Sequence, residues 1–244
     1  AMEALRYAWE ATMSRGHVGD IWHPYWERVF QNDLCLLQYL RTQMFQGARS
    51  RQKGANVRVF DNIVKENNLD NFAPPGNIVG TVPAGTGILI LATSDVEIYN
   101  NRIINNKTIG TGIVSYFMTE LPVTDTLYNP YTSAIHVHDN FFERGKQIPT
   151  LKHEIGTLLF LKFGRDVPDI IYDGMPDPQY LNSDGIIFPE RKLCIQDNSN
   201  ADFLNLEIDK NFEKWYTPFF ARFSQDVLPY NCELPPLKET LTSQ

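Results

Sequence analysis

The chain is poor in cysteine, has no concentration of basic residues and contains no long apolar run. It has 3 cysteines in 244 residues, too few for a disulfide framework, and none forms a CxxC pair or another metal-binding spacing. Lys and Arg total 22 against 29 Asp and Glu, and the net charge of -7 argues against a nucleic-acid partner. Its apolar runs, such as that within 157–161, are far too short to cross a bilayer. We therefore expect no transmembrane segment, no nucleic-acid partner, and no metal or other cofactor.

What the chain does contain is one short pattern that occurs four times. Alternating apolar and variable residues end in an Asx-Asn pair at 57–62, 96–101, 135–140 and 193–198. The closing asparagines are 39, 39 and 58 residues apart (62 to 101, 101 to 140 and 140 to 198), which is typical of a repeat interrupted by insertions of unequal length. A repeated strand and turn predict a solenoid.

The alternation within each copy separates two faces of a strand. Branched aliphatic residues occupy every second position, so they point to one side and form the core. The closing asparagine suits a tight bend, and stacked copies would align these amides as a ladder. The predicted ladder residues are Asn62, Asn101, Asn140 and Asn198. The predicted outward residues are Arg58, Phe60, Glu97, Tyr99, His136, His138, Cys194 and Gln196.

Further strands are predicted where a glycine precedes an apolar segment, at 86–91, 111–116 and 184–188. Without the intervening insertions each copy has roughly 22 to 24 residues, the length of one coil of a parallel β-helix. A β-propeller blade of about 40 residues is the competing period, but it needs antiparallel hairpins, and Asp-Gly turn signals occur only at 173 and 184. We predict a mainly β chain that forms a parallel β-helix.

A family resemblance supports this fold class for about three quarters of the chain. The segments that carry it are 57–68, 71–74, 82–88, 96–101, 135–140, 193–198 and 232–236. In their order and spacing, residues from about 55 to 244 resemble the carboxyl-terminal half of a family of bacterial right-handed parallel β-helix repeat proteins. Many of these are predicted secreted proteins or lipoproteins. The resemblance implies right-handed winding and a periplasmic or secreted location, although no signal peptide opens this chain, and it implies no catalytic residues.

Residues 1–54 depart from the repeat. Leu5, Ala8, Trp9 and Met13 recur at helical spacing, and no Asx-Asn unit occurs before residue 56. An open end of a solenoid exposes unpaired strand edges, so we predict a helical cap at 1–54 and a β-helix at 55–244. A separate binding module is the alternative for the helical segment.

Two of the cysteines lie in the region of family resemblance. A bridge between Cys194 and Cys232 would tie the carboxyl-terminal tail to the last coil, as in a protein of an oxidising compartment. Three reduced thiols in a cytosolic protein are the alternative.

The outward residues suggest a function if the copies stack. Neighbouring rungs about 4.8 Å apart would form a strip of aromatic rings beside ionisable groups, which suits a carbohydrate or another cell-envelope polymer. Insertions at 69–85, 119–133 and 146–184 interrupt the coils at one or a few bends, so we expect them to project from the same edge and build walls beside this strip. The predicted binding residues are Phe60, Glu97, Gln196, Tyr128 and Tyr131. Tyrosines that merely pack the loops onto the solenoid are the alternative.

Catalysis on the same strip is a second possibility. A polysaccharide lyase or C5-epimerase acting on uronates needs a base, a group that neutralises the carboxylate and often an acid. His136 or His138 would be the base, Arg58 the neutralising group and Tyr99 the acid. The non-catalytic alternative is a surface ladder of ion pairs on a structural spacer or assembly subunit.

An acidic insertion offers a candidate for calcium. Asp166, Asp169, Asp173, Asp177 and Asp184 lie among glycines and prolines, and their oxygens are calcium ligands by type. Their spacing matches neither an EF-hand nor a repeat-toxin motif, so a solvated loop is the favoured interpretation.

Overall fold

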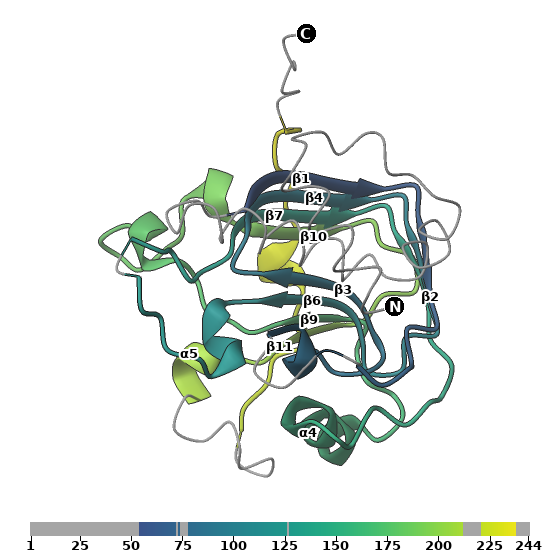
Figure 1. The fold of residues 1–244 in the computed structure, drawn as a ribbon. Coiled ribbons are helices and arrows are strands. Elements are labelled where there is room, and N and C mark those ends of the chain that lie inside the picture. The colour runs from purple at the N-terminus through teal and green to yellow at the C-terminus, as the bar shows by residue number, and fades with distance from the viewer. Residues whose placement is uncertain (1–53, 72, 74–77, 126, 212–220, 238–244) are drawn as a thin grey trace, which may run out of the picture.

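The described part of the protein is mainly β and contains few helices (Figure 1). The computed structural model describes residues 54–71, 73, 78–125, 127–211 and 221–237. The predicted helical segment therefore lies outside the described residues, apart from residue 54. In the described regions no helix combines the length and apolar character needed to cross a membrane.

All strand pairs within the three sheets are parallel. Sheet A contains β1 (Ala55–Phe60), β4 (Ser94–Tyr99), β7 (Ser133–His138) and β10 (Leu193–Gln196), in that order. Sheet B contains β2 (Ile63–Lys65), β5 (Arg102–Ile104) and β8 (Phe141–Glu143). Sheet C has the order β11 (Phe203–Asn205), β9 (Ile170–Tyr172), β6 (Ile109–Val114) and β3 (Thr86–Leu91).

The chain visits the three sheets in a fixed order. Strands β1, β2 and β3 belong to sheets A, B and C, and the next six strands repeat that order twice. After β10 the chain returns to sheet C as β11, and Ser199 bridges Phe141 where a further strand of sheet B would lie. Each return to sheet A adds one strand beside the previous one (Figure 1).

The register of sheet A places equivalent positions of the four copies side by side. Val57 pairs with Val96, Val96 with Ile135, and Ile135 with Leu193. The inward face of each strand therefore contributes to one core. Ile98, Ile113 and Phe142, from sheets A, C and B respectively, are all fully buried in this core.

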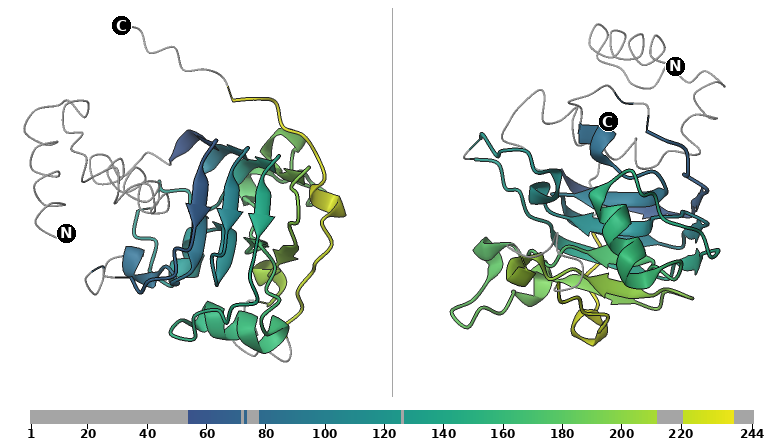
Figure 2. Two further views of the ribbon diagram at one scale, coloured as in Figure 1. Left: turned by 90° about the vertical axis from the view of Figure 1, so that its right-hand side faces the viewer. Right: turned by 90° about the horizontal axis from the view of Figure 1, so that it is seen from below.

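A second apolar cluster covers the other face of sheet C. The helix α4 (Glu154–Phe163) places Leu159 against Ile171 and Leu204 of β9 and β11. Figures 1 and 2 show α4 beside sheet C, on the side away from sheet A. The apolar run at 157–161 is thus part of a covering helix. A short helix, α5 (Ile208–Asn211), follows β11.

The remaining described helices are single 3-10 turns in the connections. They are η1 (Ile78–Thr81), η2 (Tyr116–Thr119), η3 (Pro178–Tyr180), η4 (Pro189–Arg191) and η5 (Leu228–Tyr230).

The closing asparagines form a hydrogen-bonded ladder at the bend between sheets A and B. The Oδ1 of Asn101 accepts bonds from the backbone N–H and the Nδ2 of Asn62, at 3.1 and 3.0 Å. Asn101 repeats both contacts with Asn140, and Asn140 repeats them with Asn198. Each inner amide also donates to strand carbonyls, as Asn101 does to Val59 and Tyr99. The ladder thus pairs backbone groups that the bend removes from the sheets.

The Asx residue before each ladder asparagine adopts a left-handed backbone conformation, which explains the choice of Asp or Asn there. Asp61, Asn100, Asp139 and Asp197 have φ values of 56, 54, 52 and 52°, in the left-handed region. Asp and Asn tolerate this region better than other non-glycine residues because their short side chains bond locally to the backbone. The Asx-Asn motif therefore encodes one left-handed residue followed by one ladder residue.

Three local predictions from the sequence are wrong. Residues 184–188 form a turn rather than a strand, with an isolated antiparallel bridge between Leu181 and Ile187. The missing strand of sheet C is β9, which lies inside the segment assigned to an insertion at 146–184. The insertions also leave from two bends rather than one edge. Those at 66–85 and 144–169 connect sheet B to sheet C, whereas those at 115–132 and 173–192 connect sheet C to sheet A.

The ladder predicts a position-dependent loss of stability. Asn101→Ala should lower the free energy of unfolding by about 2–4 kcal/mol, because buried carbonyl and N–H groups lose their partners. Asn62→Ala, at the first rung, should cost only about 1 kcal/mol, since Asn62 is half-buried and solvent replaces part of its bonds. Urea unfolding followed by far-UV circular dichroism measures both, and equal losses would contradict the ladder as the stabilising element.

Candidate functional site

The carboxyl-terminal segment 221–237, which we call the tail, first covers the end of the core beside β10 and β11. Ser224 forms an antiparallel bridge with Asn205 of β11, and the Nδ2 of Asn205 donates to the Tyr230 hydroxyl at 2.8 Å. The Tyr230 ring lies 4.9 Å from the Phe203 ring, between centroids. Figure 2 shows this segment, in yellow, running along the last strands. The tail thereby protects the last edge of the sheets.

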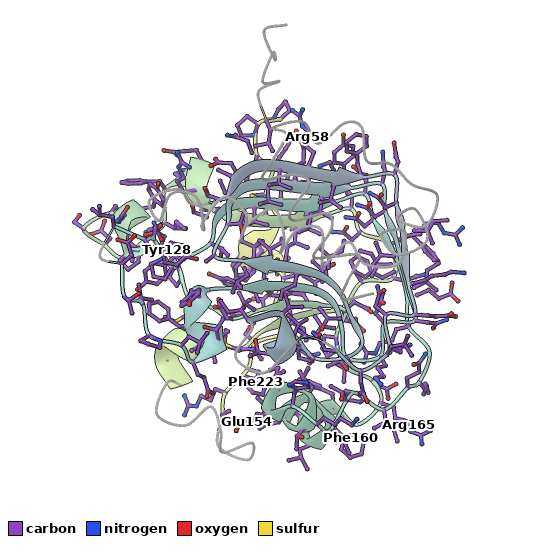
Figure 3. All side chains as sticks on the ribbon, in the orientation of Figure 1. Arg58, Tyr128, Glu154, Phe160, Arg165 and Phe223 are labelled. Carbon is purple, nitrogen blue, oxygen red and sulfur yellow. A yellow bond between two sulfur atoms is a disulfide. The ribbon has the colours of Figure 1, made fainter. Side chains whose placement is uncertain are left out.

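The tail then crosses the outer face of sheet A. Cys232 forms a disulfide with Cys194 of β10, with an S–S distance of 1.99 Å. Leu234 is buried against Ala134 and Cys194. Arg58 of β1 donates from Nη2 to the carbonyl oxygen of Leu237, so the tail contacts both the last and the first strand of the sheet. In Figure 3, Arg58 lies at the top of sheet A beside the tail.

This cover changes the environment of His136. The sequence predicted an accessible outward residue, but the side chain is only 5% exposed. Burial, followed by the neighbouring His138, lowers the pKa of His136 from 6.5 to about 4. The imidazole is therefore neutral at physiological pH, and no polymer reaches it while the tail is in place.

The second outward column consists of stacked rings. Phe60 and Tyr99 lie 5.1 Å apart with an interplanar angle of 7°, and Tyr99 and His138 lie 5.3 Å apart at 5°. We call Phe60, Tyr99 and His138 the ring column; Gln196 occupies the next rung, paired with His138. Because the rings face one another, they present edges rather than faces to solvent. The predicted strip of open aromatic faces is therefore replaced by a row of ring edges.

The two columns meet in a cluster of ionisable groups. Arg58 Nε lies 3.1 Å from Glu97 Oε2, and Glu97 Oε1 lies 3.5 Å from His138 Nε2. On its other side His138 Nδ1 is 2.7 Å from Asp139 Oδ2. The rings of His136 and His138 are 4.1 Å apart between centroids. Four of the predicted site residues, Arg58, Glu97, His136 and His138, are thus brought together, and Asp139 joins them.

This cluster has the composition of a metal site. One ligand atom from each of Glu97, His136 and His138 lies within 4.8 Å of the others, and it is the only such group among the described residues. The sequence shows no metal-binding spacing, because Glu97 is one repeat away from the His-x-His pair. Only the 39-residue register of β4 and β7 joins them.

The predicted wall residues Tyr128 and Tyr131 lie elsewhere. Tyr128 contacts Tyr116 edge to face at 5.4 Å, and Tyr131 contacts Phe117 at 5.3 Å, so both rings pack within their own loop. Figure 3 shows Tyr128 well away from Arg58. These loops adjoin the starts of the sheet A strands, whereas the ring column lies at the strand ends and the tail runs between them. The predicted single cleft is therefore divided by the tail.

The acidic insertion does not form a calcium site of converging carboxylates. Asp173 accepts from the backbone N–H groups of Ser115 and Met175, at 2.6 and 3.0 Å. Asp177 accepts from Gln179 N–H at 3.0 Å and from the side-chain amide of Asn129. Asp166 and Asp184 are exposed. The buried carboxylates in this insertion instead hold the turns between strands.

Asp169 is a buried carboxyl group of this insertion with a perturbed pKa. Burial raises its pKa from 3.8 to about 6, although the backbone N–H of Asp202 and the charge of Arg144 act in the opposite direction. A carboxyl group with a raised folded-state pKa contributes stability below about pH 4 that is lost as the pH rises through 6.

Asp169→Asn should therefore raise the free energy of unfolding at pH 7.5 by about 1–3 kcal/mol and change it little at pH 4. The matched control Asp184→Asn changes an exposed carboxylate that does not contribute to the pKa of Asp169, and it should have no such pH-dependent effect. Urea titrations at the two pH values measure this difference, and a loss of stability at pH 7.5 would refute it.

The tail predicts a second change in stability. The double variant Cys194→Ala/Cys232→Ala removes a link between residues 38 apart, which should cost about 4 kcal/mol in the chain-entropy account. Hydrogen exchange should also show lost protection around His136. Cys35→Ser leaves this pair intact and serves as the control; equal melting temperatures and exchange in all three proteins would mean that the tail is held without the disulfide.

Comparisons of this chain with protein-family models, with curated proteins and with solved structures found no match.

Proposed function

We propose that the chain is a right-handed parallel β-helix protein that acts outside the cytoplasm and binds a carbohydrate or other cell-envelope polymer along the outer face of sheet A. The cyclic order of the three sheets supports the winding, because crossover connections between parallel strands are right-handed in nearly all proteins. The Cys194–Cys232 disulfide supports the location, since such bonds persist mainly in oxidising compartments.

The observation that carries the binding proposal is the ring column with its next rung. Phe60, Tyr99, His138 and Gln196 lie on four successive strands in one register, which gives a straight row roughly 14 Å long at about 4.8 Å per strand. Phe60 is 45% exposed. A linear polymer lying along the row would meet a similar surface at each step.

The chemistry of the row suits oxygen-rich chains. Aromatic edges carry partial positive charge, so they attract hydroxyl and carboxylate oxygens. The Tyr99 hydroxyl and the Gln196 amide add hydrogen-bonding groups, and Arg58 adds a half-buried cation. Mutual stacking already fixes the rings, so binding would cost little side-chain entropy.

The lyase or epimerase alternative has less support from this geometry. His136 is buried beneath the tail, and His138 Nε2 is turned toward Glu97 rather than toward open solvent. A base for a polymeric substrate would require the tail to move first.

Affinity electrophoresis against a panel of acidic and neutral polysaccharides tests the binding proposal. Phe60→Ala should weaken retardation about fivefold, which corresponds to roughly 1 kcal/mol for one lost contact. Gln196→Ala should act similarly through one lost hydrogen bond. Phe188→Ala is the matched control, because this ring is 40% exposed on a loop across the tail from the row.

Retardation by at least one polymer, reduced only in the two row variants, would support the proposal. The absence of retardation throughout the panel, or an equal reduction in Phe188→Ala, would overturn it and leave a structural spacer. Ultraviolet absorption of unsaturated products in the same samples would identify a lyase, and loss of product in His138→Ala would assign the base.

A further inference from the structure

The cluster of Glu97, His136 and His138 has more acceptor atoms facing one another than donors to pair them. His138 Nδ1 lies 2.7 Å from Asp139 Oδ2, a distance that requires a proton on Nδ1 between the two atoms. In the neutral ring the opposite nitrogen, Nε2, then carries a lone pair. This lone pair faces the Glu97 carboxylate oxygen Oε1 at 3.5 Å. Two acceptors at this distance repel each other unless a cation lies between them.

His136 adds a third acceptor at the same place. Its Nε2 is buried without a hydrogen-bond partner among the described residues, and so is the Nε2 of His138. The whole His136 side chain is 95% buried, since its exposed fraction is 5%. An unpaired buried polar atom costs roughly 1–3 kcal/mol, so a partner for these nitrogens would stabilise the fold.

We propose that Glu97, His136 and His138 bind one divalent transition-metal ion of the Zn²⁺ type, with Asp139 orienting the His138 ring. This proposal goes beyond polymer binding and does not depend on it. Two imidazole nitrogens and one carboxylate oxygen are a usual ligand set for Zn²⁺, and they are poor ligands for Ca²⁺ or Mg²⁺. A carboxylate that holds the far nitrogen of a ligating histidine is the usual outer-shell partner.

The distances between the three ligand atoms are close to those around a bound Zn²⁺ ion. Bonds of about 2.0–2.1 Å in a tetrahedral arrangement place neighbouring ligand atoms about 3.4 Å apart. Glu97 Oε1 and His138 Nε2 already meet this separation at 3.5 Å. The three ligand atoms lie within 4.8 Å of one another, so small side-chain rotations bring the third into place.

The proposed ion would connect two strands and lie close to the charge of Arg58. Glu97 comes from β4 and both histidines from β7, so the ion would link two neighbouring strands beneath the tail. Arg58 pairs with the other oxygen of Glu97, and its positive charge opposes a cation at the site. Removing this charge with Arg58→Gln should tighten metal binding, whereas a merely structural ion-pair ladder would lose stability without gaining affinity for metal.

Isothermal titration of the full chain with Zn²⁺ at pH 7.5, with Co²⁺ absorption as a ligand-number readout, tests the proposal. One ion per chain should bind with a dissociation constant in the micromolar range or below, and Ca²⁺ and Mg²⁺ should not compete. Glu97→Gln and His138→Gln should each weaken binding at least about 100-fold. Asp139→Asn should weaken it about tenfold, in line with the loss of an outer-shell partner.

Three controls keep the result interpretable. Asp197→Asn changes the equivalent corner one strand further on, where φ is also 52°, and should leave metal affinity unchanged. Asn adopts this conformation as readily as Asp, so neither corner variant disturbs the backbone. The double variant His17→Ala/His23→Ala removes the other closely spaced histidines and should also retain binding. Urea midpoints show whether each variant is folded.

Three results would overturn the proposal: no Zn²⁺ binding by the folded chain, binding unchanged in His138→Gln, or binding lost in His17→Ala/His23→Ala. If the folded chain binds no Zn²⁺, a proton between His138 and Glu97 separates the two acceptors instead, and the cluster is an ion pair.

Discussion

The structure depends on parallel pairing in register, which places the same position of every repeat in one column. In sheet A this pairing aligns four asparagines at one bend, and each amide after the first accepts from the backbone and the side chain of the preceding asparagine. A slip of one residue would turn the inward aliphatic residues outward and separate the amides at once. The ladder and the core therefore specify the same register, and the position of every outward side chain follows from it.

The tail determines which of those outward columns is exposed to solvent. A strand face that points away from the core is ordinarily solvated, but here Cys194 is fully buried and His136 nearly so, because the tail lies over them. The adjacent ring column stays at the surface. One sheet face thus carries a column that is most buried at His136 and Cys194, beside a ring column that is most exposed at Phe60.

The degree of solvent exposure also affects how strongly the ionisable groups interact. Arg58, Glu97, His138 and Asp139 form a continuous chain of contacts from β1 to the end of β7. In water such pairs contribute little, because solvent screens them. Here Glu97 and His138 are mostly shielded from solvent, with side chains 13% and 15% exposed, so an unmatched acceptor between them is costly. Sheet A therefore carries a row of ring edges beside a mostly buried cluster of ionisable groups.

Much of the fold could be predicted because short local sequence patterns specify its strands and bends. The alternation at 57–60 and its copies gave the sheet A strands, and the Asx-Asn pairs gave the bends, since both depend on local backbone preferences. Strand β9 and helix α4 escaped prediction because they lie in an insertion without the repeat, where Ile170 and Leu159 are apolar for reasons of packing alone.

The sequence by itself determined the repeat, the parity of its faces and the columns of equivalent residues. Only the tertiary structure decided which outward residues are reachable, because the cover over His136 comes from a segment about a hundred residues further along the chain. It also decided that Glu97 meets His138 and that the rings stack, since these contacts join positions 39 or more residues apart. Local propensities determine strands and bends, but burial and charge pairing depend on what the whole chain places next to them.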